Sequence, residues 1–254
     1  MSEYVVHEEM VGPLTIRILQ EEYPENPRTS CDELGIMVCW ARRHRLGDQQ
    51  PKESPSEYFS GICNAELRPE SEWSTDEEPK LEKCCLVIPL YLYDHSGLTM
   101  NTTGFSCPWD SGQVGYIYVT HKRICEEYGV KRVTTLVKDQ HGKKVRAIDM
   151  ARRALEAEVA IYDYYLKGEV YMYVVEDENG DTLDSCGGYI GGKTYPNDSQ
   201  EEKDRSSWDY MLEEARSMAR WHLEDRAKKK AERTKTLIKH RVPLEKRELA
   251  EKGA

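Results

Sequence analysis

The sequence predicts an α+β protein with a mostly antiparallel sheet, helices on one face of that sheet and a long C-terminal helical arm. Three observations support this class. Short β-rich runs alternate with clusters of turn residues, an Asn-Gly pair joins two such runs, and clear helical periodicity is confined to residues 146–166 and 208–240. We therefore expect a core domain over residues 1–205 and an arm with a basic tail over residues 206–254.

The N-terminal part of the chain predicts a hairpin, a strand and an excursion. Two apolar runs within residues 4–19 flank a Gly-Pro pair, which is typical of a hairpin. Leu34–Trp40 is too short and too continuously apolar for an amphipathic helix, so we expect a buried central strand. Residues 48–83 are rich in Pro, Glu and Ser, which indicates a surface excursion with one short helix near residues 56–67.

The middle of the chain alternates strands and helices. Leu86–Tyr93 and Gln113–Val119 are β-rich runs that enclose a loop crowded with polar, aromatic and glycine residues. A helix is expected over His121–Tyr128, where a glycine follows. The clearest helix covers residues 146–166, because its apolar side chains recur at steps of three and four.

A hairpin and a long helix complete the chain. Val170–Glu176 and Thr182–Ile190 flank the Asn-Gly pair, which is the strongest short-range hairpin signal. A helix should then run from Trp208 to about His240, and its apolar face extends only as far as Leu223. We expect the first half of this helix to dock on the sheet and the second half to project into solvent.

The absence of targeting signals predicts a cytoplasmic protein without a membrane partner. The first ten residues lack the apolar core of a signal peptide, and no run of about eighteen apolar residues could span a bilayer. In that compartment the eight cysteines are expected to be reduced thiols. None of them forms a CxxC pair, so no zinc finger is expected, and we predict no metal and no cofactor.

The charge is unevenly distributed along the chain. The net charge is −10, but the segment from Arg226 onward holds eleven basic and four acidic residues. Lys228, Lys229 and Lys230 are the candidate contacts of this segment, either for an acidic host protein or for a second copy in a homo-oligomer. No aromatic residue follows Trp221, so we do not expect a nucleic-acid partner.

The loop between the two central strands contains the candidate catalytic residues. Cys107 would be the nucleophile of a cysteine-dependent hydrolase, His95 its general base, and Asp110 or Asp94 the carboxylate that orients the imidazole. Against catalysis, Cys107 precedes a proline and a strand, whereas cysteine nucleophiles commonly lie where a helix begins. The alternative is a buried thiol held in place by Trp109 and its neighbouring proline.

Other features of the sequence predict binding sites. Trp109, Tyr116 and either Arg42 or Arg43 would line a pocket for a nucleotide signal, which would make the protein a ligand sponge.

Two further groups of residues leave alternatives open. His121 and Cys125 lie four residues apart on an expected helix, a spacing that is compatible with two metal ligands. Asp184–Gly188 is either a tight strand bend or a segment that lines the same cleft as residues 110–112.

Three pieces of the chain together resemble a known group of proteins. They are Pro24–Asp48 with its LGIMVCWARRHRLGD, the central PLYLYDHSG…FSCPWDSGQVGYIYV, and helix 146–166 running into YDYYLKGEVYMYVVEDENGDTLDSCGGYIG. This combination is similar to a widespread group of uncharacterised proteins encoded by bacteriophages and other mobile elements, over most of residues 24–192. The resemblance implies a phage context and no known activity.

The leading hypothesis is binding rather than catalysis. We expect a phage or mobile-element accessory protein that binds a host protein, with inhibition of antiphage defence among its expected roles. The loop that contains Trp109 would be the contact surface of fixed shape. The excursion at residues 48–83 and the C-terminal arm would supply adaptable contacts.

Overall fold

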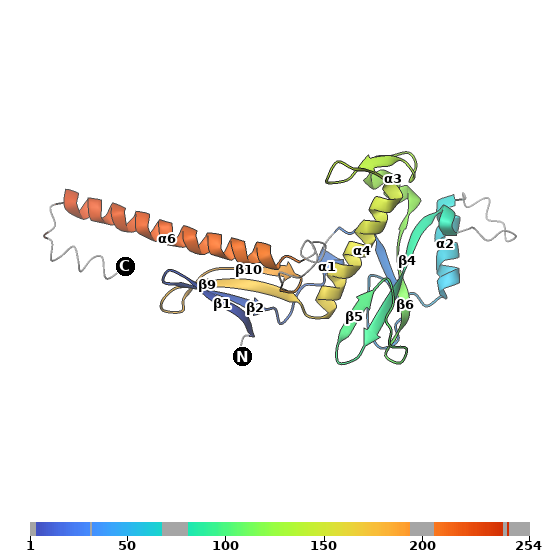
Figure 1. Cartoon of the computed structure of the whole chain (residues 1–254), viewed down its shortest axis with the longest axis horizontal. Coiled ribbons are helices and arrows are strands. Elements are labelled where there is room, and N and C mark those ends of the chain that lie inside the picture. Colours follow the sequence, from blue (N-terminus) through green and yellow to red (C-terminus); the bar gives the residue numbers. More distant parts are fainter. Residues whose placement is uncertain (1–3, 31, 68–80, 194–205, 241–242, 244–254) are drawn as a thin grey trace. The chain divides into compact units, whose positions relative to one another are not determined.

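The structure is a computed structural model that describes residues 4–30, 32–67, 81–193, 206–240 and 243. It confirms the α+β class, with antiparallel sheets and a long helix near the C-terminal end (Figure 1). The chain forms two compact units. The terminal unit consists of Met1–Glu22 with Val170–Ala254, and the central unit consists of Tyr23–Glu169.

This grouping differs from the expected division into residues 1–205 and 206–254. The N-terminal hairpin pairs with strands that lie late in the chain, and the C-terminal helix packs on the sheet that they form together. The helix is therefore part of a unit with its own core. The sequence gives no local sign of this long-range pairing.

The terminal unit is built on a four-stranded antiparallel sheet in the order β1-β2-β9-β10. Its strands are β1 (Val5–Val11), β2 (Leu14–Gln20), β9 (Val170–Glu176) and β10 (Thr182–Ile190). Both predicted hairpins are confirmed. Gly12 with φ 62° lies in the first turn and Gly180 with φ 84° in the second, in a left-handed conformation that favours glycine.

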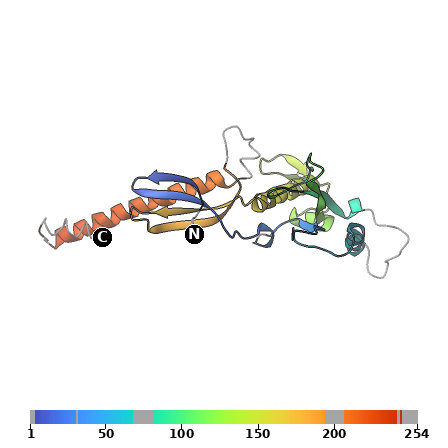
Figure 2. The ribbon, with the colours of Figure 1, turned by 90° about the horizontal axis from the view of Figure 1, so that it is seen from below.

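Helix α6 (Trp208–Lys239) packs its first half on one face of this sheet (Figure 2). The buried side chains of α6 are Trp208, Met211, Leu212, Ala215 and Ala219. They share a core with apolar side chains of β2 and β9, among them Ile16 and Val175. Burying this stripe stabilises a helix that would be marginal in isolation.

The second half of α6 leaves the sheet, as the sequence predicts. Arg226 forms ion pairs with Asp177 and Glu178 of the β9–β10 turn, at 3.5 and 3.3 Å. Every side chain from residue 227 to residue 233 is exposed. The helix therefore continues beyond the Arg226 ion pairs with exposed, mostly charged side chains, and Figure 1 shows α6 extending past the strands of the sheet.

The central unit contains a second antiparallel sheet in the order β3-β6-β4-β5. Its strands are β3 (Ile36–Cys39), β4 (Cys85–Asp94), β5 (Leu98–Asn101) and β6 (Ser111–Thr120). The two β-rich runs predicted around the central loop are β4 and β6, which form the longest pairing of this sheet. β5 is an additional short strand within the predicted loop.

The buried strand predicted over Leu34–Trp40 forms as β3, but the prediction that it is a central strand is wrong. β3 pairs along its length only with β6 and lies at one edge of the sheet, where its other side makes a single parallel bridge from Val38 to Gln49. Its apolar run reflects cover on both faces: Met37 joins the core on one side of the sheet and Val38 the core on the other. A continuous apolar run indicates burial, and burial does not fix the position of a strand within a sheet.

Helices cover both faces of the central sheet, so the expectation of helices on one face only is wrong for this sheet. α4 (Ala147–Leu166) packs on one face through side chains that include Leu155 and Val159. α2 (Pro55–Leu67) lies on the opposite face, with Phe59 and Cys63 buried against Val38. Part of the segment predicted as a surface excursion, residues 48–83, therefore covers one face of this sheet.

The smaller elements lie around this core. They are α1 (Pro27–Ser30), the 3-10 turn η2 (Leu81–Lys83), α3 (His121–Glu127), β7 (Leu136–Lys138) and β8 (Lys144–Arg146). The prediction of a helix over His121–Tyr128 is confirmed, and Gly129 follows it with φ 61°. β7 and β8 pair as a separate two-stranded ribbon.

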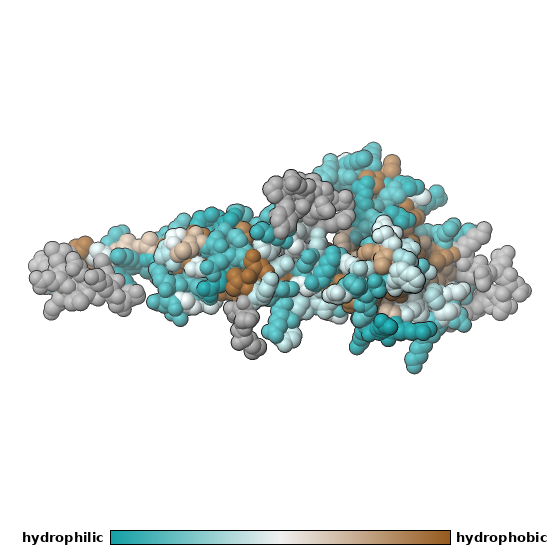
Figure 3. All heavy atoms as spheres, turned by 60° about the horizontal axis from the view of Figure 1, so that its bottom comes forward, coloured by the Kyte–Doolittle hydropathy of each residue, from teal (hydrophilic) through white to brown (hydrophobic). Residues whose placement is uncertain are grey.

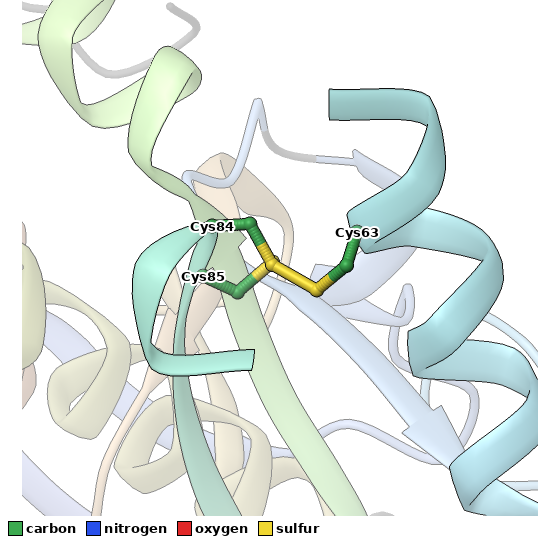
Figure 4. Close-up of side chains that lie close together, drawn as sticks. All are labelled: Cys63, Cys84 and Cys85. Atoms are coloured by element: carbon green, nitrogen blue, oxygen red, sulfur yellow. A yellow bond between two sulfur atoms is a disulfide. The ribbon is translucent and has the colours of Figure 1, made fainter. Parts of the chain in front are cut away.

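A disulfide bond joins Cys63 of α2 to Cys84, the residue before β4 (Figure 4). Their Cα atoms are 5.7 Å apart, within the range that a disulfide requires. The prediction that all eight cysteines are reduced thiols is therefore wrong for this pair. The sequence could not indicate the pairing, because the two residues meet only when α2 packs on the sheet.

Ionic contacts of the buried Arg28 connect four segments of the central unit. The side chain of Arg28, 2% exposed, pairs with Asp48 at 2.6 Å and with Glu158 of α4 at 2.9 Å. Glu158 also accepts backbone hydrogen bonds from Leu34 and Gly35, and Arg28 donates to the Gly35 carbonyl. Burial opposes the charged form of Arg28, but the hydrogen bonds to both carboxylates outweigh it and raise the pKa of this guanidinium.

Removing Arg28 should strongly destabilise the central unit. Arg28→Ala leaves two carboxylates without their cation, and breaking a buried pair in this way costs about 3–5 kcal/mol. Hydrogen exchange of peptides from β4 and β6 measures the opening free energy of this unit alone. Arg146→Ala, which breaks an exposed pair with Asp149, is the matched control and should change exchange little. Equal effects of the two variants would contradict this role.

Loss of the disulfide should also lower the stability of the central unit. Cys63 and Cys84 are 21 residues apart, and opening a loop of this size costs about 2–4 kcal/mol under non-reducing conditions. Cys63→Ser should therefore speed exchange in α2 and β4, whereas Cys125→Ser should not. In the presence of a reductant and a metal chelator, wild type and Cys63→Ser should exchange at the same rate in α2 and β4, because neither then has a covalent or metal link between these elements. An unreduced digest that releases the two cysteine peptides separately would refute the bond.

Candidate functional site

The central loop, residues 102–110, connects β5 to β6 and is held by its own hydrogen bonds. The Asn101 side chain accepts from the backbone of Thr103 and Gly104, at 3.2 and 2.7 Å. At the other end, the Asp94 N–H donates to the Asp110 carbonyl at 2.8 Å, and the Ser111 hydroxyl donates to the backbone of Cys107. The loop therefore has a defined shape although it lies outside the sheet.

Trp109 projects from this loop into solvent. Its side chain is 91% exposed, more than any other exposed large apolar residue of the described chain. The apolar residues visible in Figure 3 gather in separate patches on a mostly hydrophilic surface. The expectation that Trp109 holds Cys107 in a buried position is wrong, because its ring is almost entirely open to solvent.

The structure brings Cys107, His95 and Asp110 together, but not in the order that catalysis needs. The Cys107 thiol donates to an Asp110 carboxylate oxygen at 3.7 Å, and His95 Nδ1 lies 3.4 Å from the same oxygen. The carboxylate therefore takes the place next to the thiol that a general base would occupy. A carboxylate repels a thiolate, so this arrangement does not activate Cys107 as a nucleophile.

A second imidazole–carboxylate pair lies beside the first. His44 Nε2 is 2.8 Å from an oxygen of Asp94, which precedes His95 in the chain. Arg42 and Arg43 are exposed and come directly before His44. The chain sequence did not indicate the His44 contact, since it depends on how residues 41–49 cross the end of β4.

The nucleotide pocket predicted from Trp109 and Tyr116 does not form. Tyr116 packs edge-on against Trp40 and Phe59, at centroid distances of 6.2 and 5.4 Å, on the face that α2 covers. About 16 Å of β6 separates Ser111, near Trp109, from Tyr116. Tyr116 is therefore part of the aromatic core, and Arg42, Arg43 and Trp109 remain as exposed candidates for binding.

His121 and Cys125 line a common depression beside residues 130–133. Burial lowers the pKa of His121, and its Nε2 is a buried atom without a hydrogen-bond partner in the described chain. Within the described residues this pair gains no third ligand at close range. The helical spacing is confirmed, but a metal site at these two residues is not supported.

A different set of cysteines comes together instead. The sulfur atoms of Cys63, Cys84 and Cys85 all lie within 4.8 Å of one another and are buried between α2 and the sheet (Figure 4). The expectation that the cysteines are separate reduced thiols did not indicate this cluster. The adjacent Cys84 and Cys85 could have indicated a thiol cluster, but the third cysteine, Cys63, lies on a helix, 21 residues before Cys84 in the sequence.

The segment Asp184–Gly188 is a strand bend in β10. The pairing register with β9 shifts between Cys186 and Tyr189, and Gly188 has φ 82°. The Gly188 N–H donates to the Glu21 carboxylate, which lies so close to Gly187 that a side chain there would collide with it. These contacts explain the two glycines structurally. Asp184–Gly188 belongs to the terminal unit and residues 110–112 to the central unit.

The basic candidates Lys228, Lys229 and Lys230 lie on the exposed part of α6. Lys228 and Lys229 pair along the helix with Glu224 and Asp225, at 3.9 and 2.7 Å. Such exposed pairs contribute little to stability. The lysines are therefore accessible to a partner.

Comparison of the chain with family models, with curated proteins and with solved structures finds no match. Among the described residues, no helix has the length and apolar character needed to cross a bilayer.

The geometry predicts an unactivated thiol at Cys107. Cys186 is an exposed thiol of β10 that serves as an internal comparison. In native protein, Cys107 should react with iodoacetamide no faster than Cys186, because its neighbour is a carboxylate and its position is partly covered. Site-resolved mass spectrometry of timed samples gives both rates. A Cys107 rate tenfold above that of Cys186 would support the hydrolase and contradict this interpretation.

Proposed function

We propose that this chain is a non-catalytic binding protein whose central loop contacts a partner protein through Trp109. The observation that carries the proposal is a 91% exposed indole on a loop whose ends are fixed by hydrogen bonds. Tryptophan is the residue type most enriched among residues that dominate binding energy. A loop of fixed shape also loses little conformational entropy on association.

The residues around Trp109 indicate the chemistry of the partner surface. His95 lies in the turn between β4 and β5 and is 62% exposed. The exposed Arg42 and Arg43 directly precede His44, which pairs with the neighbouring Asp94. An apolar pocket for the indole with acidic groups at its rim would complement this surface. The two arginines would mainly increase the association rate, because exposed charges steer the encounter more than they add affinity.

The exposed half of α6 supports a second, weaker contact. Its lysines are accessible and carry a positive charge that complements an acidic host protein or an acidic surface of another copy. This contact would weaken as salt rises, because exposed charges are screened over about 8 Å at physiological ionic strength.

The sequence resemblance supplies the biological setting of the proposal. A phage or mobile-element protein acts inside the bacterial host, so the expected partner is a host protein of the cytoplasm, with antiphage defence components as one class. A cysteine-dependent hydrolase is the second candidate. The position of Asp110 between His95 and Cys107 argues against it.

Trp109→Ala should abolish partner capture and leave the fold intact. The indole makes few contacts within the chain, so the thermal midpoint should not change, whereas the loss of a dominant contact costs about 2–4 kcal/mol of binding, or about 30-fold or more in Kd. Quantitative mass spectrometry of pull-downs from bacterial lysate, followed by affinity measurement on the purified partner, gives the readout.

The matched control is Trp221→Ala, which removes another exposed tryptophan, 55% exposed, from α6. A genuine partner is retained by wild type and by Trp221→Ala but lost by Trp109→Ala. If no host protein shows this dependence, or if Trp109→Ala binds with unchanged affinity, the proposed surface is wrong.

A further inference from the structure

Three buried sulfur atoms converge where two would be enough for a disulfide. Cys63, Cys84 and Cys85 are each at most 4% exposed, and their sulfurs lie within 4.8 Å of one another (Figure 4). Cys63–Cys84 is the bonded pair. Cys85 lies outside that bond, and its side chain joins the same core cluster as the other two.

The chain reaches this arrangement by a turn directly before β4. Successive side chains of a regular strand point to opposite faces, so Cys84 and Cys85 would diverge if both belonged to one. The turn η2 ends at Lys83, and the Cys84 N–H donates back to the Leu81 carbonyl at 3.1 Å. β4 begins only at Cys85, which allows both sulfurs to face α2.

We infer that these three cysteines, once the disulfide is reduced, form a binding site for a thiophilic cation of the Zn²⁺ type. Zn–S bonds are about 2.3 Å long, so tetrahedral coordination places the sulfurs about 3.8 Å apart. The Cys63 and Cys84 sulfurs are bonded to each other and would separate to that spacing once the bond is reduced, and the Cys85 sulfur already lies within 4.8 Å of both. Thiolates are also the donor class that selects Zn²⁺ and Cu⁺ over the hard cations.

The change of state is a balanced exchange. A thiol reductant of the glutathione or thioredoxin class gives two electrons and two protons to the Cys63–Cys84 bond and is itself oxidised to a disulfide. Binding of the cation then displaces the protons of the three thiols. In both states a covalent or coordinate link connects α2 to the start of β4, so the helix stays clamped to the sheet.

The ligand set consists of the three sulfurs. His121 is a neighbour of this cluster, since its backbone N–H donates to the Cys84 carbonyl at 2.7 Å. The Nε2 atom of its side chain is buried and has no hydrogen-bond partner in the described chain. That nitrogen does not lie within 4.8 Å of all three sulfurs, so His121 is not assigned as a ligand.

Cobalt is the spectroscopic probe for this site. Full-length protein, reduced and desalted without oxygen, should bind one Co²⁺ per chain with an intense sulfur-to-cobalt charge-transfer band, and Zn²⁺ should displace the cobalt. The same protein with its disulfide intact should show no such band. Cys85→Ser should lower the affinity at least tenfold and reduce the band by about a third. Cys125→Ser, which removes a thiol of α3, should match wild type.

A second measurement needs no variant. Zn²⁺ should protect Cys63, Cys84 and Cys85 of the reduced protein from alkylation, whereas Cys125 and Cys186 should react at unchanged rates. Site-resolved mass spectrometry separates the two groups. Three results would overturn the inference: no cobalt binding by the reduced protein, equal binding by the oxidised protein, or a band that Cys85→Ser does not change. Each would mean that the cluster is only a disulfide next to a thiol of the core.

Discussion

The central unit depends on the buried guanidinium of Arg28. This one side chain connects the loop at Asp48, the backbone at Gly35 before β3, and Glu158 on α4. Asp48 in turn accepts the Met37 N–H at 2.8 Å, which aligns the first residues of the edge strand. An edge strand needs such additional partners, because no full strand pairs with the backbone groups on its open side. In β3 the backbone of Gln49 also serves this role, since it accepts the Cys39 N–H at 2.9 Å. The position of the edge strand on the sheet is thus fixed by charge as well as by packing.

Local signals in the sequence predicted the local structure well. The glycines of both terminal-unit turns adopt the left-handed conformation that a tight turn requires, and the apolar steps of three and four match the buried face of α4. The apolar stripe of α6 ends where the buried contacts end. In each case the sequence pattern itself lies within one turn or one helix, so it can be read without knowledge of the fold.

The parts that sequence reasoning missed depend on contacts between distant segments. β3 is an edge strand because β6 pairs with β4 on its other side, and no residue in β3 records this. The same holds for the candidate site. His95, Cys107 and Asp110 were correctly grouped, but the register of β4 against β6 decides that the carboxylate lies between the other two. The cysteine cluster likewise depends on the packing of α2, which composition suggested would be exposed.

The projecting half of α6 has an electrostatic consequence of its own. Residues 227–239 rise about 1.5 Å each, so the far end of the helix lies about 20 Å from the Arg226 contact with the sheet. That length is more than twice the screening length of about 8 Å in physiological salt. Counter-ions therefore screen the helix tip from the carboxylates of its own sheet. The tip keeps its positive potential although the chain as a whole is acidic. Spatial separation along a single helix lets a net-negative protein present a cationic end.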